Sequence, residues 1–586
     1  MDGLEFVTAL EAPPRESARV DVACFVGFVA RRGDVTPQAG ESDGARLQRV
    51  LPPWVRDWLV QRRWMRLDSD GLDLPGRVSD LGRTADQLAE LDDVPVPLES
   101  WDSFDELFDW DNRGVEVTES SRRAGTRLGA AVQEFFERGG RRAYVVRVGD
   151  PLPVFAGRAA RLARVHRLIP NLFGLLGPRA ASFNADTLSA WAEILQPVSP
   201  ADPTTWRGIG HLLGLPDVSF LLLPDLPDLL AAEQPSFVPA AGPRRPERFV
   251  ELQDAPLGRV DLGLRSIPAP RCDAQAFEQW AALVGGIGEF FASRRNGLRE
   301  TQFIGALPLP IIERDSALAP GSAGAADPLT RAYARVQAAR QAQWTAAATV
   351  QTAFVQLVYP WLRTFQSHRQ PAGLAAPDGT WGGLLAANAL TNGTWRSLQR
   401  TELPGILAVE PMVDPSVQQQ ILPWLPGSTA ANRTIRERIT LIGPVGGGLR
   451  VLSDVTTDDD DAYRQGSVCR LTAALLRAAR TLGETFVFRS NGPRLWRELK
   501  DAFEALLEQL WTEGALDGTT PQKSFTVRCD PSTMSQADID AGRLVAEIAF
   551  QPAANIERIV VVLAMDDGGQ VSLIGLRPEA QRREAA

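Results

Sequence analysis

The feature that most constrains the fold is a long apolar run near the start of the chain, VDVACFVGFVARR (Val20–Arg32). A strand with one face in water alternates apolar and polar residues, whereas this run is almost continuously apolar before Arg31. That pattern is typical of a strand buried on both faces, as in a parallel sheet covered by helices. The sequence therefore predicts an α/β layer that begins at this strand.

Helical and strand patterns alternate after this run. The segment Arg123–Arg138 carries apolar residues at helical spacing and stops at Gly139, a residue type common just after the end of a helix. A strand pattern follows at once at Arg142–Val148, and another lies at Val218–Leu223. The alternation favours a sheet flanked by helices.

The length of 586 residues predicts about three or four domains, or fewer large ones. We expect an N-terminal arm at residues 1–19, an α/β region at 20–430, a C-terminal α+β domain at 431–552 and a C-terminal arm at 553–586. Residues 34–90 are predicted to form an irregular insertion, and residues 225–330 a second one that is rich in proline and loops.

The C-terminal domain is predicted from one amphipathic helix and several strands. The helix, Pro493–Glu513, places apolar residues at spacings of three and four from Trp496 to Leu510. Strands are expected at Thr485–Arg489, Phe525–Cys529 and Leu544–Phe550.

The two ends of the chain are predicted to form arms outside this domain. The last strong β pattern is Ile556–Met565, and its unpaired edge must be covered. It pairs either within its own domain or with the sheet of a neighbouring subunit. The candidate residues for an inter-subunit arm are Phe6, Val7, Leu10, Ile559, Val560, Val561, Val562 and Leu563.

Composition excludes several classes of protein. The net charge of −10 and the pI of about 5.2 argue against a nucleic-acid binder, which needs a basic surface. Only two of the 62 basic residues are lysines, Lys500 and Lys523, and neither follows a glycine, so a P-loop is excluded. The four cysteines are far apart, which predicts neither a zinc site nor disulfides and suits assembly in the cytoplasm. We expect no secretory signal and no membrane insertion, because no apolar run is long enough.

No constellation of residues predicts catalysis. His166, His211 and His368 are interpreted as a helix-face, a core and a loop histidine, and no GxSxG motif is present. The acidic run Asp458–Asp461 lacks the spacing of a calcium loop, and Gly443–Gly448 leads into a strand rather than a helix. The sequence therefore predicts no catalytic, cofactor or metal residues.

Many segments, in this order and spacing, resemble contractile tail sheath proteins of phage tails, R-type pyocins and extracellular contractile injection systems. The segments that carry the resemblance are Val22–Gly33, Val94–Phe108, Leu128–Val148, Leu215–Asp225, Tyr359–Arg363, Pro371–Ser397, Phe486–Asp530 and Asp538–Val561. Two features depart from the family pattern: a PGVY-type opening is missing, and the chain continues past the usual end as MDDGGQVSLIGLRPEAQRREAA.

The resemblance implies a subtilisin-like α/β domain without protease chemistry, an inner C-terminal α+β domain and extended terminal arms. It implies homo-hexameric rings that stack helically around an inner tube protein, in a phage tail-like particle with baseplate and cap proteins. Contraction would then drive the tube through a target envelope. Two alternatives stay open: a cap or baseplate-proximal subunit with the sheath fold, and an α/β hydrolase with an unrecognised triad.

Overall fold

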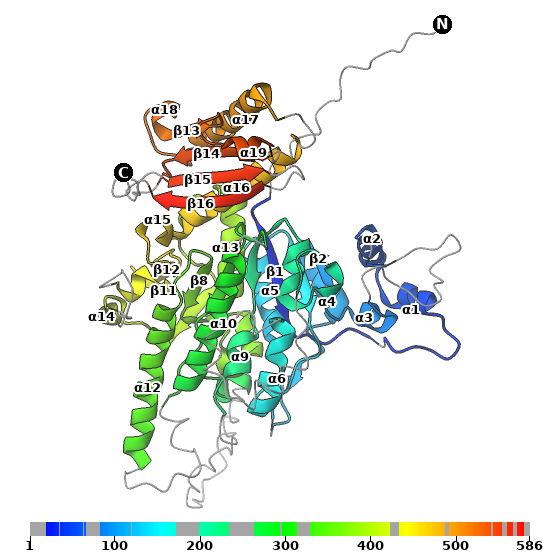
Figure 1. Cartoon of the computed structure of the whole chain (residues 1–586). Helices are drawn as coiled ribbons and strands as arrows, with labels where there is room; N and C mark the ends of the chain where they lie inside the picture. Colours follow the sequence, from blue (N-terminus) through cyan, green and yellow to red (C-terminus); the bar gives the residue numbers. More distant parts are fainter. Residues whose placement is uncertain are drawn as a thin grey trace, which may run out of the picture. The chain divides into compact units, whose positions relative to one another are not determined.

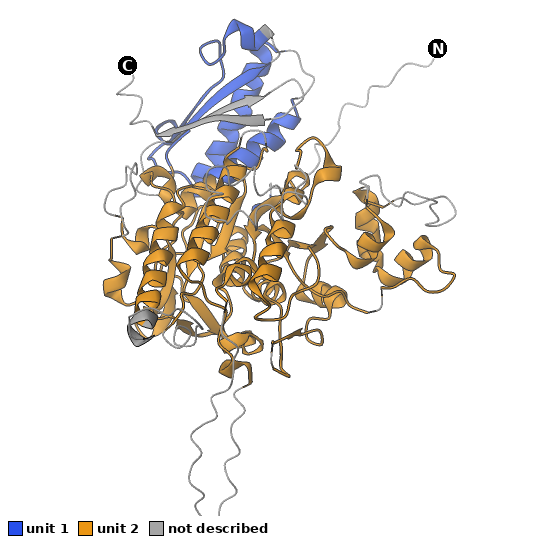
Figure 2. Cartoon of the chain, turned by 60° about the horizontal axis from the view of Figure 1, so that its bottom comes forward, with its two compact units in different colours: residues 1–20, 472–551, 558–586 blue, residues 21–471, 552–557 orange. Residues whose placement is uncertain are grey.

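The computed structural model describes residues 19–33, 35–62, 64–65, 83–118, 120–170, 198–233, 263–293, 296–312, 328–421, 433–486, 491–540, 543–553, 559–565 and 571–578. The chain divides into two compact units (Figure 2). The smaller unit comprises residues 1–20, 472–551 and 558–586, and the larger unit comprises residues 21–471 and 552–557.

The larger unit contains an eight-stranded sheet with the order β12-β11-β8-β7-β6-β1-β5-β2. The six central strands pair in parallel, and the two edge strands pair antiparallel to their neighbours. The strands are β1 Val22–Gly27, β2 Pro95–Leu98, β5 Ala143–Arg147, β6 Val218–Leu222, β7 Gln302–Ala306, β8 Val355–Tyr359, β11 Thr440–Val445 and β12 Gly448–Val451. The predicted parallel α/β layer is confirmed.

Helices cover both faces of this sheet (Figure 1). Within β1, Val22, Cys24 and Val26 pack into one apolar core, while Ala23 and Phe25 pack into the other. The first core is covered by α6 Arg158–Leu168, α9 Leu226–Leu230, α10 Ala274–Ala292 and α12 Pro328–Thr349, and the second by α5 Arg127–Glu137 and α13 Pro377–Thr391. Burial on both faces explains why the sequence of β1 does not alternate.

The segment 34–90, expected to be irregular, forms helices in its described parts. They are α1 Asp43–Val50, α2 Pro53–Gln61 and α3 Ala85–Glu90, followed by α4 Trp101–Phe108. The hydroxyls of Ser42 and Thr84 accept hydrogen bonds from the first turns of α1 and α3. These capping residues begin short helices in a segment that is rich in turn-forming residues and was therefore predicted to form loops.

Arg31 joins three of these helices. Its guanidinium donates to the carbonyl oxygens of Val50 at 2.7 Å, Ala89 at 3.3 Å and Leu107 at 2.5 Å, close to the C-terminal ends of α1, α3 and α4. Those carbonyls have no partner inside their helices and carry partial negative charge. Burial lowers the pKa of Arg31 to about 10, so the group stays protonated at neutral pH.

The remaining elements of the larger unit are short. They are β3 Val115–Glu116, β4 Arg123–Ala124, β9 Trp361–Thr364, β10 Ile406–Glu410, α14 Pro415–Gln418, α15 Asp461–Arg464 and several 3-10 turns. Gly446 and Gly447 form the turn between β11 and β12 with positive φ, so the glycine-rich segment is a hairpin turn.

The smaller unit is built on an antiparallel sheet with the order β13-β14-β15-β16. Its elements are the later part of α16 Gly466–Glu484, α17 Pro493–Thr512, α18 Pro521–Ser524, β13 Phe525–Arg528, α19 Gln536–Asp540, β14 Leu544–Phe550, β15 Ile559–Met565 and β16 Val571–Pro578. The predicted face of α17 is buried at Trp496, Leu499, Phe503 and Leu507, and the helix packs against β13.

The structure differs from the sequence prediction at two places, the strand expected at Thr485–Arg489 and the domain boundary expected at residue 431. Thr485 and Phe486, predicted to begin a strand, lie in a turn, and the rest of that segment lies outside the described residues. The boundary expected at residue 431 differs from the division between residues 471 and 472, inside α16. The reason is that β11 and β12 complete the larger sheet. Within the described ranges, no helix is long and apolar enough to cross a membrane.

Candidate functional site

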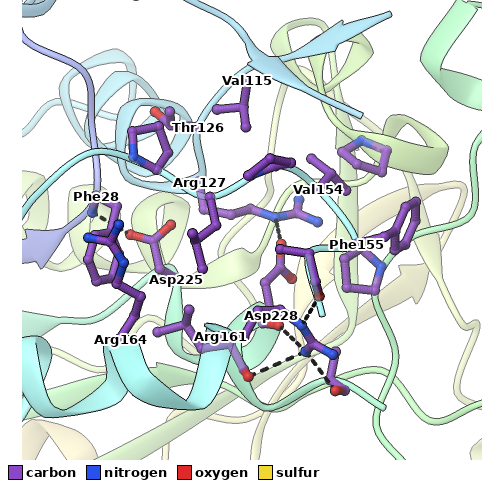
Figure 3. A pocket seen from close by; sticks show the side chains of 18 of the residues that line it. Phe28, Val115, Thr126, Arg127, Val154, Phe155, Arg161, Arg164, Asp225 and Asp228 are labelled. Atoms are coloured by element: carbon purple, nitrogen blue, oxygen red, sulfur yellow. Dashed lines mark hydrogen bonds and ion pairs between the residues drawn. The ribbon is translucent and has the colours of Figure 1, made fainter. Parts of the chain in front are cut away.

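A cavity of about 160 Å³ lies where the strand order of the larger sheet reverses. β1 lies between β5 and β6, and the cavity is lined by the segments that follow these three strands (Figure 3). These segments supply Phe28, residues 151–157 and residues 225–233. In open α/β sheets this position is the usual place for a ligand or an active site.

Asp225 is the most perturbed acid in this cavity. Its Oδ2 accepts a hydrogen bond from the backbone N–H of Phe28 at 2.9 Å. A Cβ on Gly27 would lie 2.3 Å from the same oxygen, so the carboxyl occupies space that only glycine leaves free. Burial raises the pKa of Asp225 to about 7, which makes the carboxyl partly protonated at neutral pH.

The arginines of the cavity are held by the protein itself. Arg127 pairs with Asp228 at 2.8 Å and donates to the carbonyl oxygen of Leu374 at 2.7 Å. Arg161 donates to backbone carbonyls that include Ala156 at 2.8 Å and Ala231 at 2.7 Å. These guanidinium groups therefore join loops and stabilise the ends of the strands.

The lining contains no nucleophile and base pair. No serine, cysteine, histidine or lysine is among the described residues that line this cavity, and Thr126 supplies the one hydroxyl. That hydroxyl accepts from the indole N–H of Trp110 at 3.0 Å and from the N–H of Gly129 at 3.2 Å, so it caps α5. The cavity lacks the arrangement that acyl transfer requires.

The three histidines occupy structural positions, as the sequence predicted. His211 is buried, and its Nε2 lies 3.1 Å from Oδ1 of Asp93. Burial lowers the pKa of His211, which favours the neutral ring. His166 lies on α6, and His368 is exposed in a 3-10 turn.

The acidic run Asp458–Asp461 is engaged by arginines rather than arranged around a cation. Asp459 pairs with Arg438, and Asp461 pairs with Arg433 at 2.7 Å. Across the part of the chain that the structure describes, no three histidine, cysteine or carboxylate side chains gather in a way that could hold a metal ion.

The predicted arm residues Ile559, Val560, Val561, Val562 and Leu563 all lie on β15. Within this single chain β15 pairs with β14 on one side, from Ile559↔Phe550 to Met565↔Leu544, and with β16 on the other. Pairing within its own domain was one of the two alternatives that the sequence left open. Donation to a neighbouring subunit stays a prediction.

Phe6, Val7 and Leu10 lie outside the described residues. The described chain begins at Arg19, whose carbonyl oxygen accepts a hydrogen bond from Arg477 of α16. Arg19, the one described residue of the predicted N-terminal arm, and the strands β15 and β16 of the predicted C-terminal arm therefore belong to the smaller unit. β16 was not predicted from the sequence, although two glycines, Gly568 and Gly569, before the apolar run VSLIGL are a sequence signal for a hairpin.

Residues 458–565 match the family model of the phage tail sheath C-terminal domain. This range extends from the acidic run before α15 to the last residue of β15. The match relates this C-terminal domain to the sheath proteins of phage tails, as the sequence predicted. No curated protein matches the chain.

Solved structures of contractile systems are similar to the chain. The anti-feeding prophage baseplate in its contracted state is 15% identical with a TM-score of 0.49, and the match covers 94% of this chain and 95% of that one. The anti-feeding prophage helical sheath in its contracted state is 15% identical with a TM-score of 0.45 and coverages of 95% and 97%. The contracted PVC sheath complex of an extracellular contractile injection system is 15% identical, with a TM-score of 0.41 and coverages of 79% and 84%. Because these TM-scores are low, the family-model match carries the argument.

Proposed function

We propose that this protein polymerises as stacked six-subunit rings around an inner tube and shortens to drive the tube through a target envelope. The observation that carries the proposal is the sheath C-terminal domain, which ends on a β-strand near the end of the chain. A subunit contact that does not close on itself produces a helical array, and rigid-body rotation of its subunits produces shortening. The partners are other copies, the tube protein, and baseplate and cap proteins.

The smaller unit serves as the inner domain that faces the tube, and the larger unit as a subtilisin-like domain without catalysis. The support for the second role is a parallel sheet with helices on both faces and a cavity whose described lining has no serine, cysteine, histidine or lysine. The protein is non-enzymatic, assembles in the cytoplasm, and neither binds nucleic acid nor inserts into a membrane. A cap or baseplate-proximal position remains the alternative, because the chain continues past the matched domain.

Negative-stain microscopy of the purified protein, alone and with candidate tube protein, tests the proposal. We expect tubes with sixfold end views and a length that depends on the tube protein. Single terminal discs would support the cap alternative, and a protein that stays unassembled with every tube partner would contradict a sheath role.

The donation of β15 to a neighbouring subunit is tested by linking β15 covalently to β14 of its own chain. Ala546 and Leu563 are register partners in β14 and β15, as are Val545 and Ala564. Cysteines at one pair, oxidised to a disulfide, keep β15 in its own chain, and reduction releases it. If β15 is donated, oxidised protein fails to assemble and reduced protein assembles. The four native cysteines are buried and do not compete. Equal assembly in both states would contradict donation.

A further inference from the structure

The strand β16 lies beyond the part of the C-terminal domain that matches the sheath family model. The residues that match the sheath family model end at Met565, the last residue of β15. β16 begins six residues later at Val571 and pairs antiparallel along all of β15, from Met565↔Val571 to Ile559↔Pro578. This chain therefore adds one strand to the edge at which the matched domain stops.

The two strands have opposite properties as sheet edges. β15 reads IVVVLAM, without proline, glycine or charge, and such an exposed edge is a template for pairing with another chain. β16 reads VSLIGLRP, and its register shifts so that Ile574 has no partner opposite it. A bulge, a glycine, an arginine and a proline are features that blunt an edge. β16 thus replaces a strongly pairing edge with a weakly pairing one.

We propose that β16 is an intramolecular cap that prevents β15 of a free subunit from pairing with a second copy of this chain. The cap must leave β15 before strands from two copies can pair. This inference rests on the proposed assembly through exchanged strands, and it adds that β16 regulates when β15 can pair. The partner at the uncapped edge is an extended strand of a second copy, because backbone pairing requires only a free strand edge.

Two truncations test the cap. Deletion of residues 566–586 removes β16, and deletion of residues 579–586 is the matched control that leaves it in place. In sedimentation velocity, we expect the first variant to form oligomers at a concentration roughly tenfold or more below that of the full chain. The control should behave like the full chain. Unchanged monomer in the first variant, or equal oligomers in both, would overturn the proposal.

A peptide of residues 566–586, added to the shorter chain, separates a cap from misfolding. If β15 has an open edge, the peptide pairs there and suppresses oligomers in proportion to its concentration, whereas a peptide with Leu573→Pro and Ser572→Pro does not. Oligomers that ignore the intact peptide would show that the truncation exposes unfolded chain, and the cap would then be rejected.

A second disulfide distinguishes this inference from the proposed function. Cysteines at Ala564 and Ser572, or at Met565 and Val571, join β15 to β16. We expect the oxidised form to stay unassembled and the reduced form to assemble. Suppose that the β14–β15 disulfide blocks assembly and the β15–β16 disulfide does not. Then β15 and β16 leave the sheet together as one hairpin, so the donation of β15 holds and the cap is wrong. If the β15–β16 disulfide blocks assembly and the β14–β15 disulfide does not, the cap holds and the donation of β15 is wrong.

Discussion

In the larger unit the chain forms six parallel strands bordered by antiparallel edge strands, whereas the smaller unit has four antiparallel strands, two of them from the end of the chain. The parallel strands are joined by helices that cover both faces, so a strand cannot leave without dismantling the layer. Among the described residues, the hairpin of β15 and β16 pairs with the rest of its sheet through β14. Of the two sheets, the antiparallel one that holds the terminal strands can therefore release a strand with less disruption, which is why the proposed exchange between subunits is assigned to it.

Arginine binds backbone carbonyls in both units, and in the smaller unit the buried Arg477 donates to the carbonyl oxygen of Arg19. In the larger unit, buried guanidinium groups such as Arg31 and Arg161 donate to several backbone carbonyls. A guanidinium spreads five donors over three nitrogens in a plane and so reaches carbonyls that lie apart, whereas a lysine ammonium has three donors on a single nitrogen. The excess of arginine over lysine thus has a structural explanation in the larger unit. On α17 of the smaller unit, Arg494 is exposed and pairs with Glu498 at 3.0 Å.

The largest expected effect comes from removing one core ring in each unit. Phe135 is buried with its ring 5.4 Å from that of Phe25, and Phe503 is buried on α17. Each change to alanine should lower the free energy of unfolding by about 3–5 kcal/mol. Hydrogen exchange should show that Phe135→Ala loosens the larger unit and Phe503→Ala the smaller one. The exposed Phe365→Ala is the control. Equal loosening of both units by either variant would mean that they unfold as one.

A smaller loss is expected from Arg31→Lys. The variant keeps the charge but loses donors to the carbonyls at the ends of α1, α3 and α4. We expect the free energy of unfolding to fall by about 2–3 kcal/mol in denaturant titrations. Arg494→Lys, at an exposed position, should change it by less than about 0.5 kcal/mol. Equal stability of the two variants would show that Arg31 acts through its charge alone.

The next effect depends on pH. The folded pKa of Asp225 is raised by burial from 3.8 to about 7, so folding favours the neutral acid. Stability from this group is therefore present at low pH and is lost as the pH rises from about 4 to 7. Asp225→Asn should stabilise the larger unit at pH 8 more than at pH 5, by a difference of about 1–3 kcal/mol. Parallel urea titrations at both pH values measure it, and a greater gain at pH 5 would contradict the sign.

The smallest expected effect is on duplex DNA. With a net charge of −10 and many arginines held by carbonyls or carboxylates, we expect no measurable binding at physiological salt. A gel-shift titration checks this, with the salt concentration varied. Sub-micromolar binding that weakens with salt would reveal a segregated basic surface.

Elements whose residue pattern is local could be predicted from the sequence alone. The double-sided burial of β1 is present in its continuous apolar run, and the buried face of α17 in its spacing. The residue pattern did not predict α1 and α3, because these short helices begin at single capping residues. Packing and the contact with Arg31, which follows β1, hold them in place. No local pattern shows which carbonyls a distant guanidinium will reach.

The strands that β15 pairs with and the division between the units became known from the folded chain. The sequence of β15 predicts a strand, but its backbone donors and acceptors are the same for β14, for β16 or for a strand of another copy. Likewise, α16 is one continuous helix, yet the division between the units falls inside it. Arg470 on α16 pairs with Asp454 of the larger unit, whereas Arg477, two turns later, bonds Arg19 of the smaller unit. Local sequence specifies the strand, while the choice of partner is a competition between edges that only the folded chain, or the assembly, resolves.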